Sequence, residues 1–168
     1  MRTRSAPGSL ALHPVVLGAL ALWALNDHVL KAAFPGAITG KLSDLASLIA
    51  FPALASAACE LWASRGGRRG LSAPNAVLLG WAIATALVMI TIRFEGPMAE
   101  AYRWGLGLAQ WPFRALAAAL RGEGSPGVSP VALALDPTDA LTAPAAIIPV
   151  LLGGRHRPAM RAALLRNS

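Results

Sequence analysis

Residues 26–44 read NDHVLKAAFPGAITGKLSD and separate two apolar runs, LALHPVVLGALALWAL at 10–25 and LSDLASLIAFPALASAACELWA at 42–63. With the neighbouring residues, each run approaches the ~20 residues that an α-helix needs to cross a bilayer. The Pro-Gly pair at 35 and 36 fits a tight turn between the two helices. The stretch therefore predicts a membrane-spanning helical hairpin whose turn is unusually polar.

The composition extends this interpretation to the whole chain. Hydrophobic residues make up 55% of the 168 residues and charged residues only 14%, whereas soluble domains carry about 25% charged residues. The sequence predicts an all-α integral membrane bundle of four transmembrane helices in a single domain, with spans at about 10–33, 42–63, 74–92 and 130–152.

A cleaved signal peptide is the alternative for the first run. That run ends in Asn-Asp-His and has no small-x-small cleavage pattern, which favours a retained helix.

The segment at 99–121, between the third and fourth blocks, mixes apolar residues with arginines and tryptophans. Amphipathic segments of this kind prefer the plane of the membrane interface. A fifth span is the alternative, but it would bring Arg103 and Arg114 into or near hydrocarbon, at about 2.5–3.5 kcal/mol each at the centre. We therefore expect an interfacial amphipathic segment, as one helix or a broken pair.

The positive charges predict the orientation of the chain. Nine of the 15 Lys and Arg residues fall on one side of the four-span topology: Arg2, Arg4, Arg65, Arg68, Arg69, Arg155, Arg157, Arg161 and Arg166. Positively charged loops stay in the cytoplasm, so both termini and the basic tail at 153–168 are predicted to be cytoplasmic. The net charge of +7 then indicates contact with anionic headgroups at the cytoplasmic face of the bilayer, and nucleic acid is not an expected partner.

The same topology brings polar residues of three segments to the extracytoplasmic side. The members of this candidate cluster are Asn26, Asp27, His28, Lys31, Lys41, Ser43, Asp44, Asp136, Thr138 and Asp139. Ionisable groups near hydrocarbon turn inward and find partners. We expect Asn26 or Asp27 to meet Ser43, Asp44 or the start of the fourth helix. We also expect Lys41 and Asp44 to lie near Asp136 or Asp139.

Two chemical interpretations of this cluster stay open. In the first, the residues hold the helices together: Asp27 and Lys31 are spaced i,i+4, and Asp136 precedes Pro137 as an N-cap. In the second, carboxylates and an imidazole bind a divalent cation, magnesium or calcium through oxygen or zinc with the help of histidine. The ligands would come from Asp27, His28, Asp44, Asp136 and Asp139. No HExxH, CxxC or P-loop motif is present, so no other cofactor is predicted.

The motifs NDHVLK, TGKLSD and DPTD, with YRWGLGLAQWPFRAL between the last two, cover most of the chain from about 25 to 152. In these motifs the sequence resembles a family of uncharacterised multi-pass bacterial membrane proteins. The resemblance implies a small bacterial inner-membrane protein and carries no mechanism.

We expect a non-enzymatic structural or accessory subunit or a binding module, with a membrane-protein partner or as a homo-oligomer. The alternatives are a membrane-embedded metal-dependent enzyme acting on lipid or envelope intermediates and a small oligomeric transporter or channel.

The predicted topology can be tested with reporter fusions. A reporter placed after Gly124 should give the extracytoplasmic signal, and one placed after Ser168 the cytoplasmic signal, because the arginine asymmetry holds both termini inside. Signals from the same side at both positions would contradict the four-span topology, and a cytoplasmic signal after Gly124 would indicate that the segment at 99–121 crosses the membrane.

Overall fold

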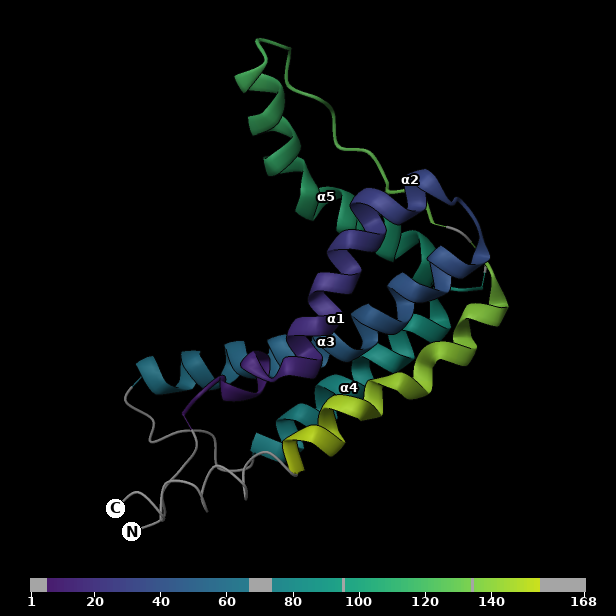
Figure 1. Ribbon diagram of the computed structural model, residues 1–168. Coiled ribbons are helices and arrows are strands. Elements are labelled where there is room, and N and C mark those ends of the chain that lie inside the picture. Colours follow the sequence, from purple (N-terminus) through teal and green to yellow (C-terminus); the bar gives the residue numbers. More distant parts are fainter. Residues whose placement is uncertain (1–5, 67–73, 95, 134, 155–168) are drawn as a thin grey trace. The chain divides into compact units, whose positions relative to one another are not determined.

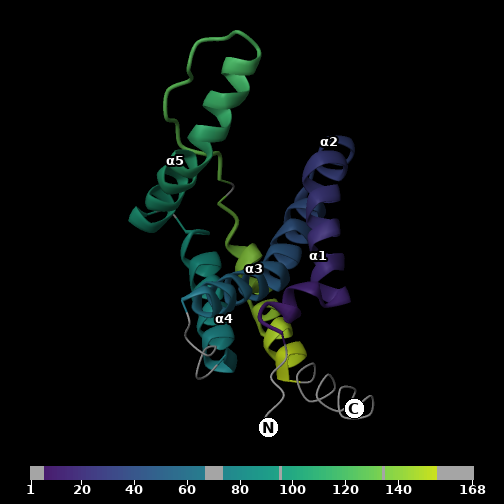
Figure 2. The ribbon, with the colours of Figure 1, turned by 90° about the vertical axis from the view of Figure 1, so that its left-hand side faces the viewer.

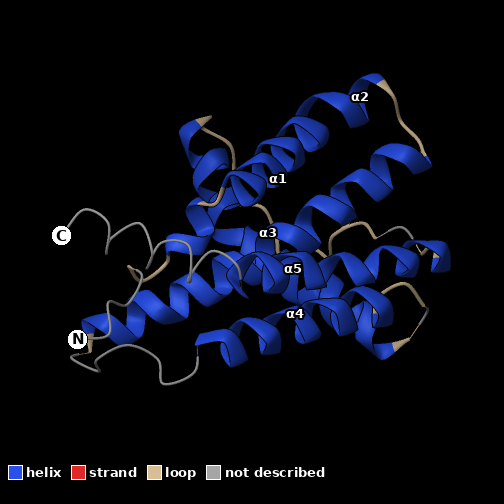
Figure 3. Ribbon diagram, turned by 60° about the horizontal axis from the view of Figure 1, so that its bottom comes forward, coloured by secondary structure: helices blue, strands red, loops and turns tan. Residues whose placement is uncertain are grey.

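The computed structural model describes residues 6–66, 74–94, 96–133 and 135–154 (Figure 1). Within these ranges the regular structure is entirely helical and no strand occurs (Figure 3). Three helical stretches are long and apolar enough to cross a membrane: Pro14–Ala33, Ala37–Arg65 and Pro74–Thr91. The predicted all-α class and the first three spans are thus confirmed at the level of length and composition. Eight of the nine arginines behind the predicted orientation, and the basic tail from 155 onward, lie outside the described residues.

The chain divides into two compact units, Met1–Leu87 with Leu141–Ser168 and Val88–Ala140. The first unit contains a 3₁₀ turn, η1 (Ser9–Leu12), followed by helix α1 (Pro14–Leu25). The helix begins at Pro14 because His13 caps it: His13 Nδ1 accepts a hydrogen bond from the Val15 N–H at 3.2 Å, and proline at N1 has no N–H to leave unpaired.

Helix α1 continues without a break through a π-helical turn, η2 (Asn26–Leu30), into the short helix α2 (Lys31–Ala33). A turn at Phe34–Gly36 leads into α3 (Ala37–Arg65). The two arms are antiparallel. At one end the Gly8 N–H donates to Glu60 Oε2 at 2.9 Å, and at the other Asn26 Nδ2 donates to Thr39 O and Ser43 Oγ. The hairpin expected around residues 26–44 is present.

Small residues allow the arms of the hairpin to approach closely. Ala46, Ala50, Ala53 and Ala57 are all buried along α3, and small side chains are the usual device for packing helices in membranes. Gly8 has φ 78°, a left-handed conformation that favours glycine. Its Cα lies over Ala57 and Leu61, where an added Cβ would meet carbon atoms at 3.6 Å.

The core of the first unit joins the hairpin to two further helical segments. Leu10, Val16 and Ala53 pack with Leu78 of α4 (Pro74–Thr91), and residues of the last helical segment lie against them: Val150 and Leu152, together with Leu20 of α1. Phe51 of α3 also meets Trp81 of α4 edge to face, with ring centroids 6.2 Å apart. These contacts fix α4 against the hairpin.

The fourth predicted span, 130–152, differs in its start. The helix begins only at Pro137, as the 3₁₀-type element η3 (Pro137–Ile147), and continues as α-helix to residue 154. Residues 123–133 and 135–136 are not helical. Pro144 lies inside η3 and has no backbone N–H to donate, which disrupts regular α-helical bonding and favours the 3₁₀ geometry. A fourth crossing is therefore not confirmed and stays a prediction.

The second unit consists mainly of α5 (Pro97–Leu120) and a returning segment of extended residues, 123–133 and 135–136, which runs back along it (Figures 1 and 2). The helix is continuous through Pro112, so the segment expected at 99–121 is one helix and not a broken pair. It ends in a Schellman turn, in which the N–H of Glu123 bonds to Ala118 O at 2.9 Å and Gly122 adopts φ 71°.

The returning segment is fastened to α5 at several levels. Arg103 and Val131 exchange two hydrogen bonds, from Val131 N to Arg103 O and from Arg103 Nε to Val131 O, each 3.1 Å long. Trp111 Nε1 donates to Pro126 O at 2.7 Å, and Arg114 Nη1 to Ser129 Oγ at 2.8 Å. The arginines of α5 therefore find their partners on the returning segment.

Gly107 lies where helix α5 and the returning segment are in close contact. Substituting this glycine tests how the two pack. A Cβ there would lie 2.2 Å from the backbone oxygen of Ser129, so Gly107→Ala should destabilise the protein by about 1–3 kcal/mol through overpacking. Gly105→Ala is the matched control: it has open space and should stabilise the helix by about 1 kcal/mol. Thermal unfolding in detergent compares the two, and equal transitions would contradict the packing described.

Candidate functional site

The π-helical turn of η2 determines which side chains of the motif NDHVLK face α3. The N–H of Lys31 bonds to Asn26 O, five residues back, instead of four. Such turns widen the helix by a residue and occur frequently at functional sites. Here the widened turn lets two consecutive residues, Asn26 and Asp27, both reach Ser43 on α3.

A chain of hydrogen bonds, which we call the hairpin network, links the two arms through Asn26, Asp27, Lys31, Thr39 and Ser43. Asn26 Nδ2 donates to Thr39 O at 2.7 Å and to Ser43 Oγ at 3.0 Å. Ser43 Oγ in turn donates to Asp27 Oδ1, which also pairs with Lys31 Nζ at 2.7 Å. The expectation that Asn26 or Asp27 turns inward and meets Ser43 is confirmed.

Asn26 is the most deeply buried member of the hairpin network, with 0% of its surface exposed. Both protons of its amide group are used, and among the described residues its Oδ1 atom has no hydrogen-bond partner. The acceptors Thr39 O and Ser43 Oγ determine this orientation of the amide, because Thr39 O can only accept. Thr39 was not anticipated: its contribution is a backbone carbonyl, which no sequence motif signals.

The other predicted residues of the first unit lie around this network. His28 is exposed, and Lys41 and Asp44 are half-buried on α3. The predicted approach of Lys41 to Asp136 or Asp139 would connect the two units and stays a prediction.

The second unit holds a buried ion pair at the junction of two helices. Arg93, just after the end of α4, pairs through Nη1 with Asp139 Oδ2 at 3.2 Å. The two residues are only 7% and 6% exposed. The Arg93 guanidinium also contacts the sulfur of Met89 through Nη2 at 3.2 Å. The sequence did not identify Arg93 as the partner of Asp139.

Asp136 performs the capping role that the sequence predicted. Its Oδ1 accepts hydrogen bonds from Thr138 N at 2.9 Å and from Thr138 Oγ1 at 2.7 Å. The N–H of Asp139 bonds to Asp136 O at 3.0 Å. The motif DPTD therefore begins a helix, with its first aspartate as the cap and its second in the ion pair with Arg93.

The predicted cation ligands are Asp27, His28, Asp44, Asp136 and Asp139. Within the described ranges, no three side chains among His, Cys, Asp and Glu gather in a way that could hold a metal ion. Cation binding stays a prediction without a defined site.

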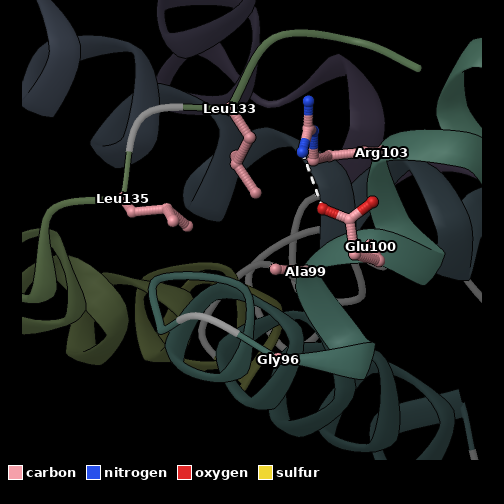
Figure 4. A pocket seen from close by; sticks show the side chains of 6 residues that line it. All are labelled: Gly96, Ala99, Glu100, Arg103, Leu133 and Leu135. Atoms are coloured by element: carbon pink, nitrogen blue, oxygen red, sulfur yellow. Dashed lines mark hydrogen bonds and ion pairs between the residues drawn. The ribbon is translucent and has the colours of Figure 1, made fainter. Parts of the chain in front are cut away.

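A pocket of about 280 Å³ lies between α5 and the returning segment, wholly inside the second unit (Figure 4). It is lined by Gly96, Ala99, Glu100, Arg103, Leu133 and Leu135. Arg103 Nη1 and Glu100 Oε1 form an ion pair of 2.6 Å on the helical wall, and the two leucines point toward it from the returning segment. The sequence did not anticipate this pocket, because it depends on the fold-back of residues 123–136.

Comparisons of the chain with protein-family models, with curated proteins and with solved structures found no match.

The Arg93–Asp139 pair gives a prediction for stability. Arg93→Met removes the guanidinium that pairs with the buried carboxylate of Asp139 and should lower the free energy of unfolding by about 3–5 kcal/mol. The double variant Arg93→Met/Asp139→Leu removes both charges and should recover most of that loss, so the two effects are not additive.

Thermal unfolding in one detergent measures both variants. Arg121→Met is the matched control, because Arg121 pairs with Glu123 in an exposed position and its loss should leave the transition unchanged. Additive losses in the double variant would contradict a direct coupling of Arg93 with Asp139.

Proposed function

We propose that the chain is a small polytopic protein of the bacterial inner membrane that acts as a non-enzymatic accessory subunit or binding module. The observation that supports this proposal is that three acidic side chains bind groups of the protein itself. Asp27 is neutralised by Lys31, Asp139 by Arg93, and Asp136 caps a helix. A catalytic carboxylate must face a reacting group, whereas these carboxylates face their own chain.

The Arg93–Asp139 pair also supports the four-span topology. It brings the end of α4 and the start of η3 together, so the chain leaves and returns to one place between them. That path favours an even number of crossings for residues 94–138. The extended segment 123–136 has backbone groups that hydrocarbon could not solvate, which favours a position for this hairpin outside the hydrocarbon core.

Helix α5 has the amphipathic character that such a position requires. One face is fastened to the returning segment through Arg103, Trp111 and Arg114. The large apolar residues exposed on the remaining surface are Met98, Trp104, Leu108, Phe113, Leu116 and Leu120. Aromatic and aliphatic residues on a helix with basic groups suit the headgroup boundary.

The orientation and the membrane assignment are further parts of the proposal. The arginine asymmetry supports cytoplasmic termini, and that orientation would put the polar cluster and the α5 hairpin on the extracytoplasmic side. The motifs NDHVLK, TGKLSD and DPTD support a bacterial inner-membrane protein of the resembled family.

Native mass spectrometry of the tagged chain tests the proposal. We expect the 17.3 kDa chain, expressed at native level in its own host and extracted in lipid nanodiscs, to carry a discrete added mass from a protein partner or a bound lipid. A tagged membrane protein of similar size, extracted in parallel, controls for carry-over. The bare chain alone, or an added mass equal to that of a metal ion, would contradict the proposal.

A further inference from the structure

The pocket of the second unit has one charged wall and one apolar wall. Glu100 and Arg103 stand one turn apart on α5, and Leu133 and Leu135 face them from the returning segment (Figure 4). A pocket with this division suits a ligand that is charged at one end and apolar at the other.

The charged wall retains unused bonding capacity. Arg103 Nε is held by Val131 O, and Arg103 Nη1 by Glu100 Oε1 at 2.6 Å. In the described residues, the structure gives no further hydrogen bond to Arg103 Nη2 or Glu100 Oε2. The two side chains are 36% and 56% exposed, so their ion pair contributes only about 0–1 kcal/mol and can exchange partners at low cost.

The sign of the charges selects the ligand class. A simple anion would be attracted by Arg103 and repelled by Glu100, and a simple cation would meet the reverse. A zwitterion satisfies both side chains, with a phosphate on the guanidinium and an ammonium on the carboxylate. Charge-assisted hydrogen bonds of these two kinds are stronger than neutral ones.

The size of the pocket limits the ligand further. A volume of about 280 Å³ corresponds to roughly nine water molecules at ~30 Å³ each. A phosphoethanolamine group with part of its glycerol has about this volume. Leu133 and Leu135 would then contact the glycerol and the first methylenes of the acyl chains.

The position of the pocket along the chain indicates a membrane source for this ligand. Gly96 lines the pocket, and α4 ends at Thr91. The chain between these two residues can span at most about 18 Å when fully extended. Since α4 is a candidate span, the pocket lies within reach of the headgroup layer of one leaflet. We propose that it binds the headgroup of phosphatidylethanolamine, an inference that rests on the proposed membrane location.

Binding of defined lipids to the full chain tests this inference. In native mass spectrometry of the purified protein in detergent, short-chain phosphatidylethanolamine should bind about ten-fold more tightly than phosphatidylglycerol. Phosphatidylglycerol has no ammonium group and therefore loses one charge-assisted hydrogen bond. Phosphatidylcholine should also bind more weakly, because its quaternary ammonium has no proton to donate. Soluble glycerophosphoethanolamine serves as the headgroup without chains and should bind more weakly than the lipid.

Two pocket variants separate the roles of the charges. Glu100→Gln should abolish the preference for phosphatidylethanolamine and leave phosphatidylglycerol binding equal or stronger, because the repelling carboxylate is gone. Arg103→Gln should weaken the binding of both lipids. The control is Glu123→Gln, which neutralises an exposed acid outside the pocket and should change neither. Glu100 is exposed, so an unchanged unfolding temperature is expected for its variant.

Equal binding of the two lipids by the unmodified chain, or a preference that survives Glu100→Gln, would overturn the inference. Glycerophosphoethanolamine binding as tightly as the lipid would overturn the membrane source. These failures differ from failure of the proposed function. A chain that keeps a protein partner in native nanodiscs but shows no lipid preference refutes the pocket assignment alone.

Discussion

The buried ion pair between Arg93 and Asp139 fixes the path of the second half of the chain. It joins residues that are far apart in sequence at 3.2 Å, with both side chains more than nine-tenths buried. An uncompensated charge in such surroundings costs several kcal/mol, so each residue holds the other in place. The segment between them must leave and return to the same point. That closure allows residues 123–136 to lie along α5, and the α5 pocket exists only because they do so.

The hairpin network does the corresponding work in the first unit. It consists of short polar bonds near the turn that connects the two antiparallel arms, while the Gly8–Glu60 bond joins the arms at their other end. Apolar packing alone positions helices weakly where the solvent is itself apolar. Hydrogen bonds between specific atoms restore a defined register. The polarity of residues 26–44 is thus a requirement of the hairpin, since each arm supplies the partners that the other needs.

Local sequence was sufficient to predict the features that depend on local chemistry. Three of the predicted apolar blocks are candidate membrane spans in the structure. A helix begins at Pro137 with Asp136 as its cap, and Asn26 and Asp27 both bond to Ser43. The features that could not be predicted depend on contacts between distant residues. The choice of Arg93 as the partner of Asp139 requires the fold-back of α5. The late start of the last helix reflects residues 123–136 being held against α5, where Gly107 leaves room for Ser129. The π-helical turn at Asn26 has no signal in composition or spacing.

The energetics of these polar groups separate those that lock the fold from those that can bind a ligand. Asn26, Arg93 and Asp139 are buried, and exchanging any of their partners would leave a polar group desolvated at a cost of about 1–3 kcal/mol or more. Glu100 and Arg103 are partly exposed, and their pair contributes at most about 1 kcal/mol. Only the second kind can trade an internal partner for an external one without loosening the helices. The polar residues of the stretch at 26–44 therefore serve the fold, and the capacity to bind lies outside that stretch, in the Glu100–Arg103 pair of α5.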